Sequence, residues 1–270
     1  MADFKAVSKF WYDGSLITGN RLEVAIDDPG LLYGATVFTT MRVYHYSIDS
    51  KLTNWAGHCD RLSTRLQAFD WLQPNWERVR QGATSMLQYF PILRITLFPD
   101  GREWIAGREL PVSLTQDQKN GKEGCIVELE RTLAAHKTGN YLSVWLAQNL
   151  ARSRSAQEAI LVDLGSGDWL ETSTGNLWGW KDGCWWTPPL NAGILPGTVR
   201  RQLIEWLQEQ NLEVKQDPWR RELVADFEAI AYSNSVVQVM PMRAIAQQTT
   251  KKHYDPHHRA LEILQGLFIE

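Results

Sequence analysis

Cysteine is scarce in this chain of 270 residues, which contains three, at Cys59, Cys125 and Cys184. They are scattered along the sequence and form neither a C-x-x-C pair nor the Cys/His spacing of a zinc site. A disulfide framework is therefore not expected, and a reducing cytoplasm fits this usage best. The opening residues, MADFKAVSKFWYDG, contain no apolar run of the kind found in secretion signals.

The chain also has no long hydrophobic run and no excess of positive charge. No apolar stretch reaches the ~20 residues needed to cross a bilayer, so we expect no membrane partner. The formal net charge is −3, and no basic field indicates binding to nucleic acid. With 44% hydrophobic residues the chain can bury a core, and its length allows one large domain or two small ones.

Several catalytic signatures are missing as well. The sequence has no G-x-G-x-x-G after an expected strand, no G-x-x-x-x-G-K-[ST], no H-E-x-x-H and no G-x-S-x-G. The six histidines do not cluster like metal ligands, so no metal site is predicted. These absences exclude the common dinucleotide, P-loop, zinc-protease and serine-hydrolase sites.

Hydrophobic periodicity predicts that the first half of the chain mixes strands with helices. β-Branched and aromatic residues along 35–44 indicate a strand, and Leu62, Leu66 and Phe69 at helical spacing indicate a helix. The expected elements are a hairpin over 10–18 that turns at Asp13-Gly14, a strand over 35–44, helices over 55–70 and 75–88, and a strand over 92–98.

A polar, glycine-bearing stretch separates the two halves and predicts a domain boundary. We expect a small N-terminal α+β domain over 1–115, a linker over 116–124 and a larger C-terminal domain over 125–270. In the larger domain the pattern predicts strands over 125–131, 158–164, 168–172, 175–181, 184–187, 212–215, 229–233 and 237–244, and helices over 139–154, 198–209, 221–227 and 256–267.

Three segments of the second half carry groups that suit pyridoxal phosphate. Lys137 lies between an expected strand end and an expected helix start, where an amine can be desolvated and made nucleophilic. Glu171 could keep the ring nitrogen of the cofactor protonated, so that the ring can accept electrons. The helix expected to begin at Thr198, after Gly197, offers free N–H groups to a phosphate.

Each candidate also has an ordinary interpretation. A single lysine is most often a solvated surface residue, and a carboxylate such as Glu171 can belong to a surface hairpin. Arg61 could add a guanidinium to the phosphate site or be a surface arginine. Asn234 and Ser235 end a buried-looking strand, where small polar residues either donate to a phosphate or form a turn.

Taken together, these segments resemble the fold-type IV pyridoxal-phosphate enzymes, or class IV aminotransferases. That family contains branched-chain aminotransferases, D-amino acid aminotransferases and 4-amino-4-deoxychorismate lyases. The resemblance covers nearly the whole chain, and the matching segments are Asp13-Gly14, Asp27–Gly34, His58-x-x-Arg61-Leu62, Lys137, Glu158–Leu161, Glu171-x-x-x-x-Asn176-Leu177 and Gly193-Ile194-Leu195-x-Gly197.

The resemblance implies a role for each candidate. Lys137 would bind the cofactor covalently and move protons, and Glu171 would hold the ring nitrogen. The phosphate would be held by Arg61, by the backbone at Thr198 and Val199, and by Asn234 and Ser235. The resemblance also implies a two-domain α+β fold with a β-barrel-like C-terminal domain, a homodimer, and a cofactor between the domains near the subunit interface.

Within the family, the stretch Phe38-Thr39-Thr40-Met41-Arg42-Val43 resembles that of aminodeoxychorismate lyases. It implies conversion of 4-amino-4-deoxychorismate to 4-aminobenzoate and pyruvate, a step of folate synthesis. Thr39 would then act in catalysis or contact the substrate, unless it is a packed strand threonine, and Phe38 would contact the substrate. Arg102 is the first candidate for a substrate carboxylate, and Arg42 is the second.

Two other functions stay open at this point. A class IV aminotransferase acting on branched-chain or D-amino acids would use the same Lys137 and Glu171, but it would need a 2-oxo acid. A cofactor-binding or regulatory protein without catalysis is the alternative of a different class. The presence of both residues argues against it, and a purified protein without the absorption band of a lysine-bound cofactor would favour it.

Overall fold

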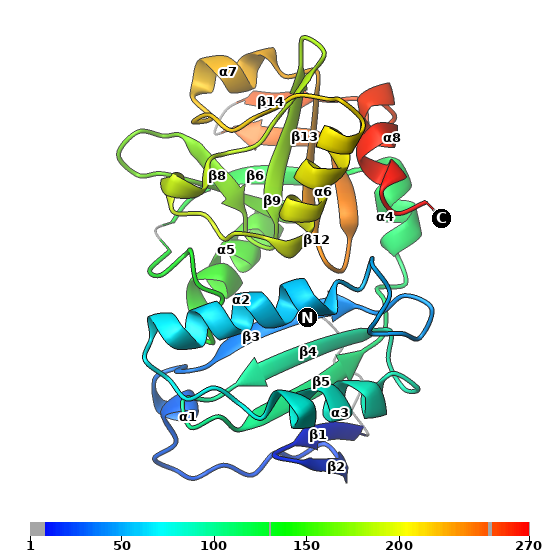
Figure 1. Cartoon of the computed structure of the whole chain (residues 1–270). Helices are drawn as coiled ribbons and strands as arrows, with labels where there is room; N and C mark the ends of the chain where they lie inside the picture. The colour runs from blue at the N-terminus through cyan, green and yellow to red at the C-terminus, as the bar shows by residue number, and fades with distance from the viewer. Residues whose placement is uncertain (1–8, 130, 248–249, 270) are drawn as a thin grey trace. The chain divides into compact units, whose positions relative to one another are not determined.

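The computed structural model describes residues 9–129, 131–247 and 250–269, and the chain divides into two compact units. Unit 1 holds the residues up to Pro111 together with His136–Tyr141. Unit 2 holds Val112–Ala135 and the residues from Leu142 onward. The chain therefore enters unit 2, returns to unit 1 for one short segment, and then enters unit 2 again. Figure 1 labels the elements of both units.

Unit 1 is built on a five-stranded antiparallel sheet with the strand order β2-β1-β5-β4-β3. The predicted hairpin is confirmed, and its turn residues Asp13 and Gly14 have φ values of 44° and 85°, as a type I′ turn requires. The strands are β1 Lys9–Tyr12, β2 Ser15–Thr18, β3 Val37–Arg42, β4 Ile92–Leu97 and β5 Glu103–Arg108.

The sequence pattern did not predict β5. Its core-facing positions are Glu103, Ile105 and Gly107, all buried, so a charged residue and a glycine replace the apolar residues that would reveal a strand. Glu103 is accommodated because Arg78 and Trp11 donate hydrogen bonds to its carboxylate. Tertiary contacts thus stabilise a strand that lacks hydrophobic alternation.

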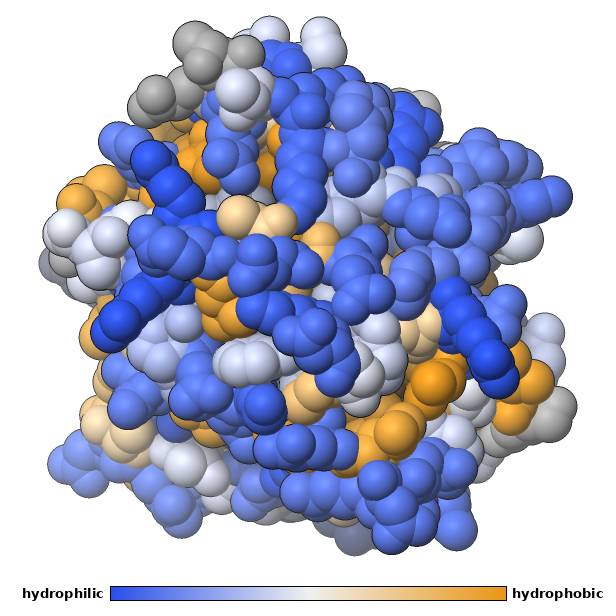
Figure 2. Space-filling model, turned by 90° about the horizontal axis from the view of Figure 1, so that it is seen from above, coloured by the Kyte–Doolittle hydropathy of each residue, from blue (hydrophilic) through white to orange (hydrophobic). Residues whose placement is uncertain are grey.

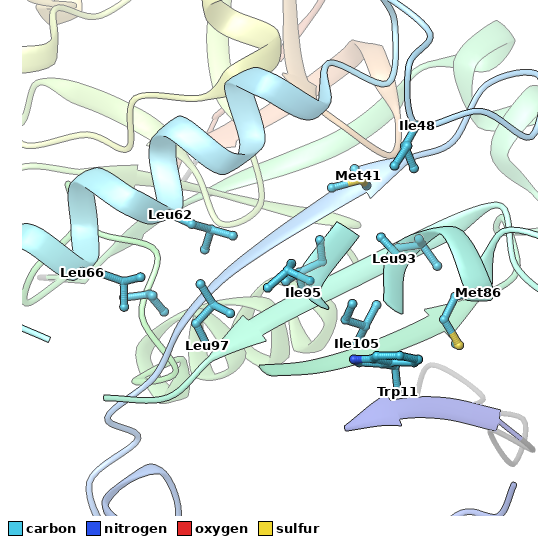
Figure 3. Close-up of a cluster of buried hydrophobic side chains, with 13 residues drawn as sticks. Trp11, Met41, Ile48, Leu62, Leu66, Met86, Leu93, Ile95, Leu97 and Ile105 are labelled. Atoms are coloured by element: carbon cyan, nitrogen blue, oxygen red, sulfur yellow. The ribbon is translucent and has the colours of Figure 1, made fainter. Parts of the chain in front are cut away.

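Helices α2 (Trp55–Ala68) and α3 (Trp76–Met86) cover one face of this sheet. Asparagine side chains cap both helices, because Asn54 and Asn75 each accept a hydrogen bond from a first-turn N–H. A short helix, α1 (Pro29–Leu32), lies between β2 and β3 in the chain. Figure 3 shows Leu62 and Leu66 of α2 and Met86 of α3 directed toward the strand side chains of this core.

Unit 2 is built on a nine-stranded mixed sheet with the order β11-β10-β9-β12-β13-β6-β7-β8, and β14 also pairs with β13. β6 runs parallel to both β13 and β7, whereas β9, β12 and β13 are antiparallel neighbours. The strands are β6 Lys122–Glu128, β7 Glu158–Val162, β8 Trp169–Thr172, β9 Asn176–Lys181, β10 Cys184–Trp186, β11 Val214–Lys215, β12 Ala229–Asn234, β13 Gln238–Gln247 and β14 Thr250–His253.

Two helical layers complete the cores of unit 2. Apolar side chains of α6 and α8 pack on β9, β10, β12 and β13, and those of α5 pack on β6 and β7. The predicted helix 198–209 coincides with α6. The helices are α4 Leu114–Asn120, α5 Leu142–Ser153, α6 Thr198–Glu209, α7 Arg221–Asp226 and α8 Arg259–Gly266, with a 3₁₀ turn over Leu190–Ala192.

The expected linker over 116–124 is corrected by the structure, because these residues form most of α4 and the start of β6. Only Leu114 is buried along α4, so the polar composition of this stretch reflects a solvated helix face and not an extended connection. The unit boundary falls at Pro111 and Val112, and the return of His136–Tyr141 to unit 1 was not predicted.

The molecular surface seen in Figure 2 is mostly hydrophilic, and its hydrophobic side chains lie in separate areas. None of the helices within the described ranges is long and apolar enough to cross a membrane.

Candidate active site

Lys137 lies on a short segment that pairs with the start of β3. The N–H of Phe38 donates to the carbonyl of Lys137 at 2.8 Å, and the N–H of Gly139 donates to the carbonyl of Thr36 at 2.8 Å. A side chain at Gly139 would not fit, because its Cβ would lie 2.3 Å from Oγ1 of Thr36. The Lys-Thr-Gly sequence therefore fixes the backbone of the lysine against the strand that carries Phe38.

Two aromatic rings lie beside the Lys137 amine. Its Nζ is 4.9 Å from the centroid of the Phe38 ring and 5.9 Å from that of Tyr141, and the two rings meet edge to face. The guanidinium carbon of Arg94 lies 3.6 Å from the same Phe38 centroid. Two cations therefore share one ring, an arrangement that favours a flat or anionic ligand nearby.

Arg94 was not among the residues proposed from sequence, and it belongs to a row of three arginines. The strand register places Arg42, Arg94 and Arg108 on the same side of the sheet as Phe38, opposite the hydrophobic core. Partial burial lowers the pKa of Arg94, and the positive charge of Arg108 acts in the same direction. Among the residues described, no carboxylate forms an ion pair with any of the three. We name these three residues the arginine row.

A sequence signal for Arg94 does exist. Along Ile92–Leu97 the residues at 93, 95 and 97 face the core, so Arg94 shares the opposite face with Thr96. All other positions of β4 are buried. A charged residue in such a strand indicates that its face of the sheet has a role other than core packing. The alternation of side chains along this strand is therefore enough to indicate Arg94 as a candidate.

Arg61 is a buried residue of α2 and not a surface arginine. Its exposed fraction is 8%, and its Nη2 donates to the hydroxyl of Thr39, which is itself hydrogen-bonded to Nδ1 of His58. Thr39 is fully buried. Its hydroxyl therefore orients Arg61, and a catalytic role for Thr39 stays a prediction.

Arg102 is engaged within unit 1. Its guanidinium donates to Asp28 at 2.7 Å, to Asp100 at 2.6 Å and to the hydroxyl of Tyr12 at 2.6 Å. Burial alone would lower the pKa of Arg102, but these hydrogen bonds raise it well above its ordinary value. Two carboxylates already match its charge, so the arginine row is the better candidate for a substrate carboxylate. Arg42, the second sequence candidate, belongs to that row.

Glu171 lies on β8, and both of its carboxylate oxygens are engaged. Arg131 forms an ion pair with Oε1, and the N–H of Leu195 donates to Oε2 at 3.3 Å. The residue is 3% exposed. A guanidinium against a buried carboxylate stabilises its ionised form, which is the form needed to accept a hydrogen bond from a protonated ring nitrogen. Arg131 was not among the residues proposed from sequence.

A pocket of about 340 Å³ in unit 2 reaches this ion pair. Leu129, Leu161 and Gly193 contribute to its walls, together with Arg131 and Glu171.

The loop before α6 is shaped by one asparagine. The side-chain amide of Asn176 donates to the carbonyl of Leu195 at 2.8 Å. A Cβ at Gly197 would lie 2.1 Å from Oδ1 of the same asparagine, so only glycine fits here. Gly197 is the N-cap of α6 and has no side-chain capping bond, so the first N–H groups of the helix stay available to an anion.

The turn between β12 and β13 carries the other proposed phosphate residues. Oγ of Ser235 lies 3.1 Å from Oγ1 of Thr198, so two sequence candidates from distant segments meet. The side chain of Asn234 accepts from the N–H groups of Val236 and Val237, both at 2.9 Å, and shapes the turn. Asn234 therefore acts through backbone geometry, whereas the Ser235 hydroxyl lies beside the start of α6.

A buried acid holds the turn that follows Glu171. Glu158 is 4% exposed and accepts hydrogen bonds from the hydroxyls of Ser173 and Thr174. Burial raises the pKa of Glu158, and the two hydroxyls only partly offset this effect. The carbonyl of Thr174 in turn accepts from the side chain of Asn234 at 3.3 Å. The loops that carry the unit 2 candidates are thus bonded to one another.

The residues present fit pyridoxal phosphate within each unit. Unit 1 offers the Lys137 amine beside aromatic rings and the buried Arg61. Unit 2 offers Glu171 beside Arg131, the uncapped start of α6 and Ser235. These are an amine for the aldehyde, an acceptor for the ring nitrogen, and donors for the phosphate.

The chain also matches a family model and known proteins. The model of the amino-transferase class IV family matches residues 36–245. The branched-chain-amino-acid aminotransferase of Escherichia coli is 23% identical over 266 residues, which cover 89% of this chain and 86% of that protein. The aminodeoxychorismate lyase of Vibrio harveyi is 23% identical over 276 residues, which cover 95% and 98%.

A solved structure shows the same architecture. The PLP-bound form of a hypothetical aminotransferase from Mycobacterium tuberculosis aligns with a TM-score of 0.83 at 16% identity, covering 97% of this chain and 99% of that one. The two-domain α+β fold of the fold-type IV enzymes is therefore confirmed. Pyridoxal phosphate is the cofactor used by this family.

Proposed function

The chain belongs to the class IV aminotransferase family, and we propose that within this family it is a lyase acting on 4-amino-4-deoxychorismate. The observation that carries the proposal is the arginine row beside Phe38, because this substrate has two carboxylates. The lyase-like stretch Phe38–Val43 and the full-length similarity to the Vibrio harveyi lyase support it.

The cofactor would be held by the residues already described. When bound, pyridoxal phosphate supplies a ring that withdraws electrons from the carbon bearing the substrate nitrogen. Lys137 would attach to its aldehyde carbon, and Glu171 would accept a hydrogen bond from its ring nitrogen. The phosphate would be bound by Arg61, the N–H groups of Thr198 and Val199, and the hydroxyl of Ser235.

The reaction requires removal of one proton, cleavage of one C–O bond and return of one proton to the leaving group. The neutral amine of Lys137 would take the proton from the carbon that bears the nitrogen, acting as general base. The C–O bond at the neighbouring carbon then breaks, and the electron pair leaves with enolpyruvate, which takes up a proton and becomes pyruvate. The six-membered ring becomes aromatic as 4-aminobenzoate. The two products contain all the atoms of the substrate, so no oxo acid is consumed.

The arginine row would hold the substrate so that this bond lies in position to break. Arg94 is part-buried beside Phe38. A carboxylate that binds there would displace few water molecules and form a charge-assisted hydrogen bond. Arg108 is more exposed and stands farther along the same face, in place for a second carboxylate. Orientation by two fixed cations restricts the ring to one pose and favours elimination.

The direct test is the release of 4-aminobenzoate from 4-amino-4-deoxychorismate by the purified protein without any oxo acid. Rapid release that disappears in Lys137→Ala would establish the lyase activity. If the wild-type protein shows the absorption band of a lysine-bound cofactor and releases no 4-aminobenzoate, the lyase proposal fails.

Aminotransferase activity is the second candidate. It is favoured by the similarity to the branched-chain enzyme of Escherichia coli over 89% of this chain. The arginine row would also suit a dicarboxylic 2-oxo acid. Transfer of the amino group from L-valine or D-alanine to a 2-oxo acid, in a protein inactive in the first assay, would establish this alternative.

We also propose that the protein is a homodimer, as the resemblance implied. Helix α5 presents Leu142, Trp145, Leu146 and Leu150 to solvent, although it buries its other face. Four exposed apolar residues along one helix indicate a surface that is covered by another molecule. Light scattering of the native protein and of Trp145→Glu measures this directly. A native protein that is monomeric at all concentrations would contradict the proposal.

A further inference from the structure

Arg200 is a buried arginine in an unfavourable position. It is the third residue of α6 and is 4% exposed. A positive charge in the first turn of a helix opposes the helix dipole, and a buried charge loses its hydration. An arginine with both disadvantages needs compensation from a nearby anion.

The partners of Arg200 are all neutral. Its Nη2 donates to the carbonyl of Pro188 at 3.0 Å and to Oε1 of Gln216 at 2.8 Å, and its Nε donates to Oγ1 of Thr187 at 3.3 Å. No carboxylate among the described residues forms an ion pair with it. Burial lowers the pKa of Arg200 to about 10, and no neighbouring negative charge raises it.

Two partly buried arginines of the chain have carboxylate partners, whereas Arg94 in unit 1, like Arg200, has none among the described residues. Arg78 pairs with Glu103, and Arg102 pairs with Asp28, so their charges are matched inside the protein. Arg200 differs because its hydrogen bonds are satisfied while its charge is not. The chain retains a cation that the protein itself does not neutralise.

The place of Arg200 in the fold indicates which anion would neutralise it. A Cβ built at Gly197 would lie 3.5 Å from the Cβ of Arg200, so the base of the side chain adjoins the uncapped start of α6. The hydroxyls of Thr198 and Ser235 meet at the same helix end. The proposed function assigns the cofactor phosphate to the N–H groups at this helix end and to the Ser235 hydroxyl.

We propose that Arg200 is a positioning residue that attracts the phosphate of the cofactor by its charge from within unit 2, without touching it. The inference rests on the proposed binding of pyridoxal phosphate. Its hydrogen bonds hold the guanidinium still, so the positive potential at the start of α6 is permanent and adds to the helix dipole. A bound phosphate would offset the cost of burying this charge.

The test compares pyridoxal 5′-phosphate with pyridoxal, which lacks the phosphate, as ligands of the full-length protein. Dissociation constants follow from equilibrium dialysis and from the visible band of the lysine-bound cofactor. Arg200→Gln should raise the dissociation constant for pyridoxal 5′-phosphate about tenfold and leave that for pyridoxal within about twofold, as expected for loss of one charge near a partly buried anion. Arg200→Lys, which keeps the charge, should restore most of the preference for the phosphate.

Arg201→Gln is the matched control, because it removes the same charge from the next residue, which is exposed and screened by water. It should leave both constants unchanged. If Arg200→Gln weakens the binding of both ligands equally, the role of Arg200 is purely structural and the inference is overturned. The inference is also overturned if the variant weakens the binding of neither ligand. If the wild-type protein itself fails to prefer pyridoxal 5′-phosphate over pyridoxal, the proposed function fails instead.

Discussion

The two units hold their candidate residues in different ways. In unit 1 several of them are long side chains on the face of the antiparallel sheet opposite the core cluster, where Lys137 and Arg94 lie over Phe38. In unit 2 they lie on loops that buried polar contacts hold together, as between Thr198 and Ser235. Unit 1 thus holds an amine and positive charge, and unit 2 holds directed N–H groups and one carboxylate.

This difference predicts which property a substitution in each unit should change. A long side chain on the sheet face opposite the core cluster can be changed without disturbing that cluster, so its loss affects reactivity or substrate affinity. A residue in bonded loops positions its neighbours, so its loss affects how the cofactor is held and polarised before it affects substrate affinity. Substitutions in each unit test that division, beginning with the largest expected effect.

Removal of the Lys137 amine should have the largest effect. Lys137→Ala should lose the absorption band of the lysine-bound cofactor and lower kcat by at least about 10³-fold, because both covalent attachment and base catalysis are lost. Absorption spectra and product release measure this. Lys119→Ala is the control, since Lys119 is an exposed residue of α4. A Lys137→Ala protein with normal turnover would refute the assignment.

In unit 2, Glu171→Gln should come next. An amide cannot stabilise a protonated ring nitrogen as a carboxylate does, so kcat should fall on the order of 10²-fold, with the cofactor still bound. Arg131→Gln should reduce kcat less, because the N–H of Leu195 still donates to Glu171. Steady-state kinetics separate the two variants. If Arg131→Gln costs more than Glu171→Gln, the order of importance proposed here is wrong.

The candidates named from the sequence lie in short motifs. Lys137, Glu171 and the start of α6 were proposed from local chemistry, as an amine before a helix, an acid in a strand and Gly197 at a helix start, and their roles stay predictions. Their spacing along the chain also matches a family pattern. Most strands and helices were predicted correctly as well, since their hydrophobic periodicity is strong.

Residues that depend on tertiary pairing were missed. Arg131 lies in no recognisable motif. It was identified only by its contact with Glu171, which lies 40 residues later in the chain. The return of His136–Tyr141 to unit 1 depends on pairing with β3. The polar helix α4 resembles a linker in composition, because a helix that buries one residue has no apolar stripe. Such features follow from the register of elements and not from any segment alone.

Two arginines of unit 1 should separate substrate binding from stability. Arg94→Gln should raise KM about 10- to 100-fold with little change in Tm, the usual cost of losing a charge-assisted hydrogen bond. Arg102→Gln should leave KM unchanged and lower Tm, because Asp28 would stay buried without its cation. Kinetics and thermal unfolding of both variants measure this. The reverse pattern would restore Arg102 as the substrate residue.

The smallest expected effect is a difference in how two buried acids respond to pH. Burial would raise the pKa of Asp28, but Arg102 and the N–H of Gly30 lower it overall. Its contribution to the free energy of unfolding is therefore present at neutral pH and is lost as pH falls through its folded pKa. Burial raises the pKa of Glu158, so its contribution is present below about pH 4.3, its ordinary value, and is lost as pH rises toward the folded pKa.

Urea unfolding of the wild type, Asp28→Asn and Glu158→Gln between roughly pH 2 and 8 tests this contrast, because the Asp28 contribution changes below about pH 4 and the Glu158 contribution changes above it. The stability of the wild type relative to Asp28→Asn should grow as pH rises, whereas its stability relative to Glu158→Gln should shrink. Each unit of pKa shift corresponds to about 1.4 kcal/mol of unfolding free energy. If the stability of the wild type relative to Glu158→Gln grows with pH as it does relative to Asp28→Asn, Glu158 is ionised in the folded protein without loss of unfolding free energy. In that case the loops of unit 2 would be held by a charged network, as Asp28 is held in unit 1.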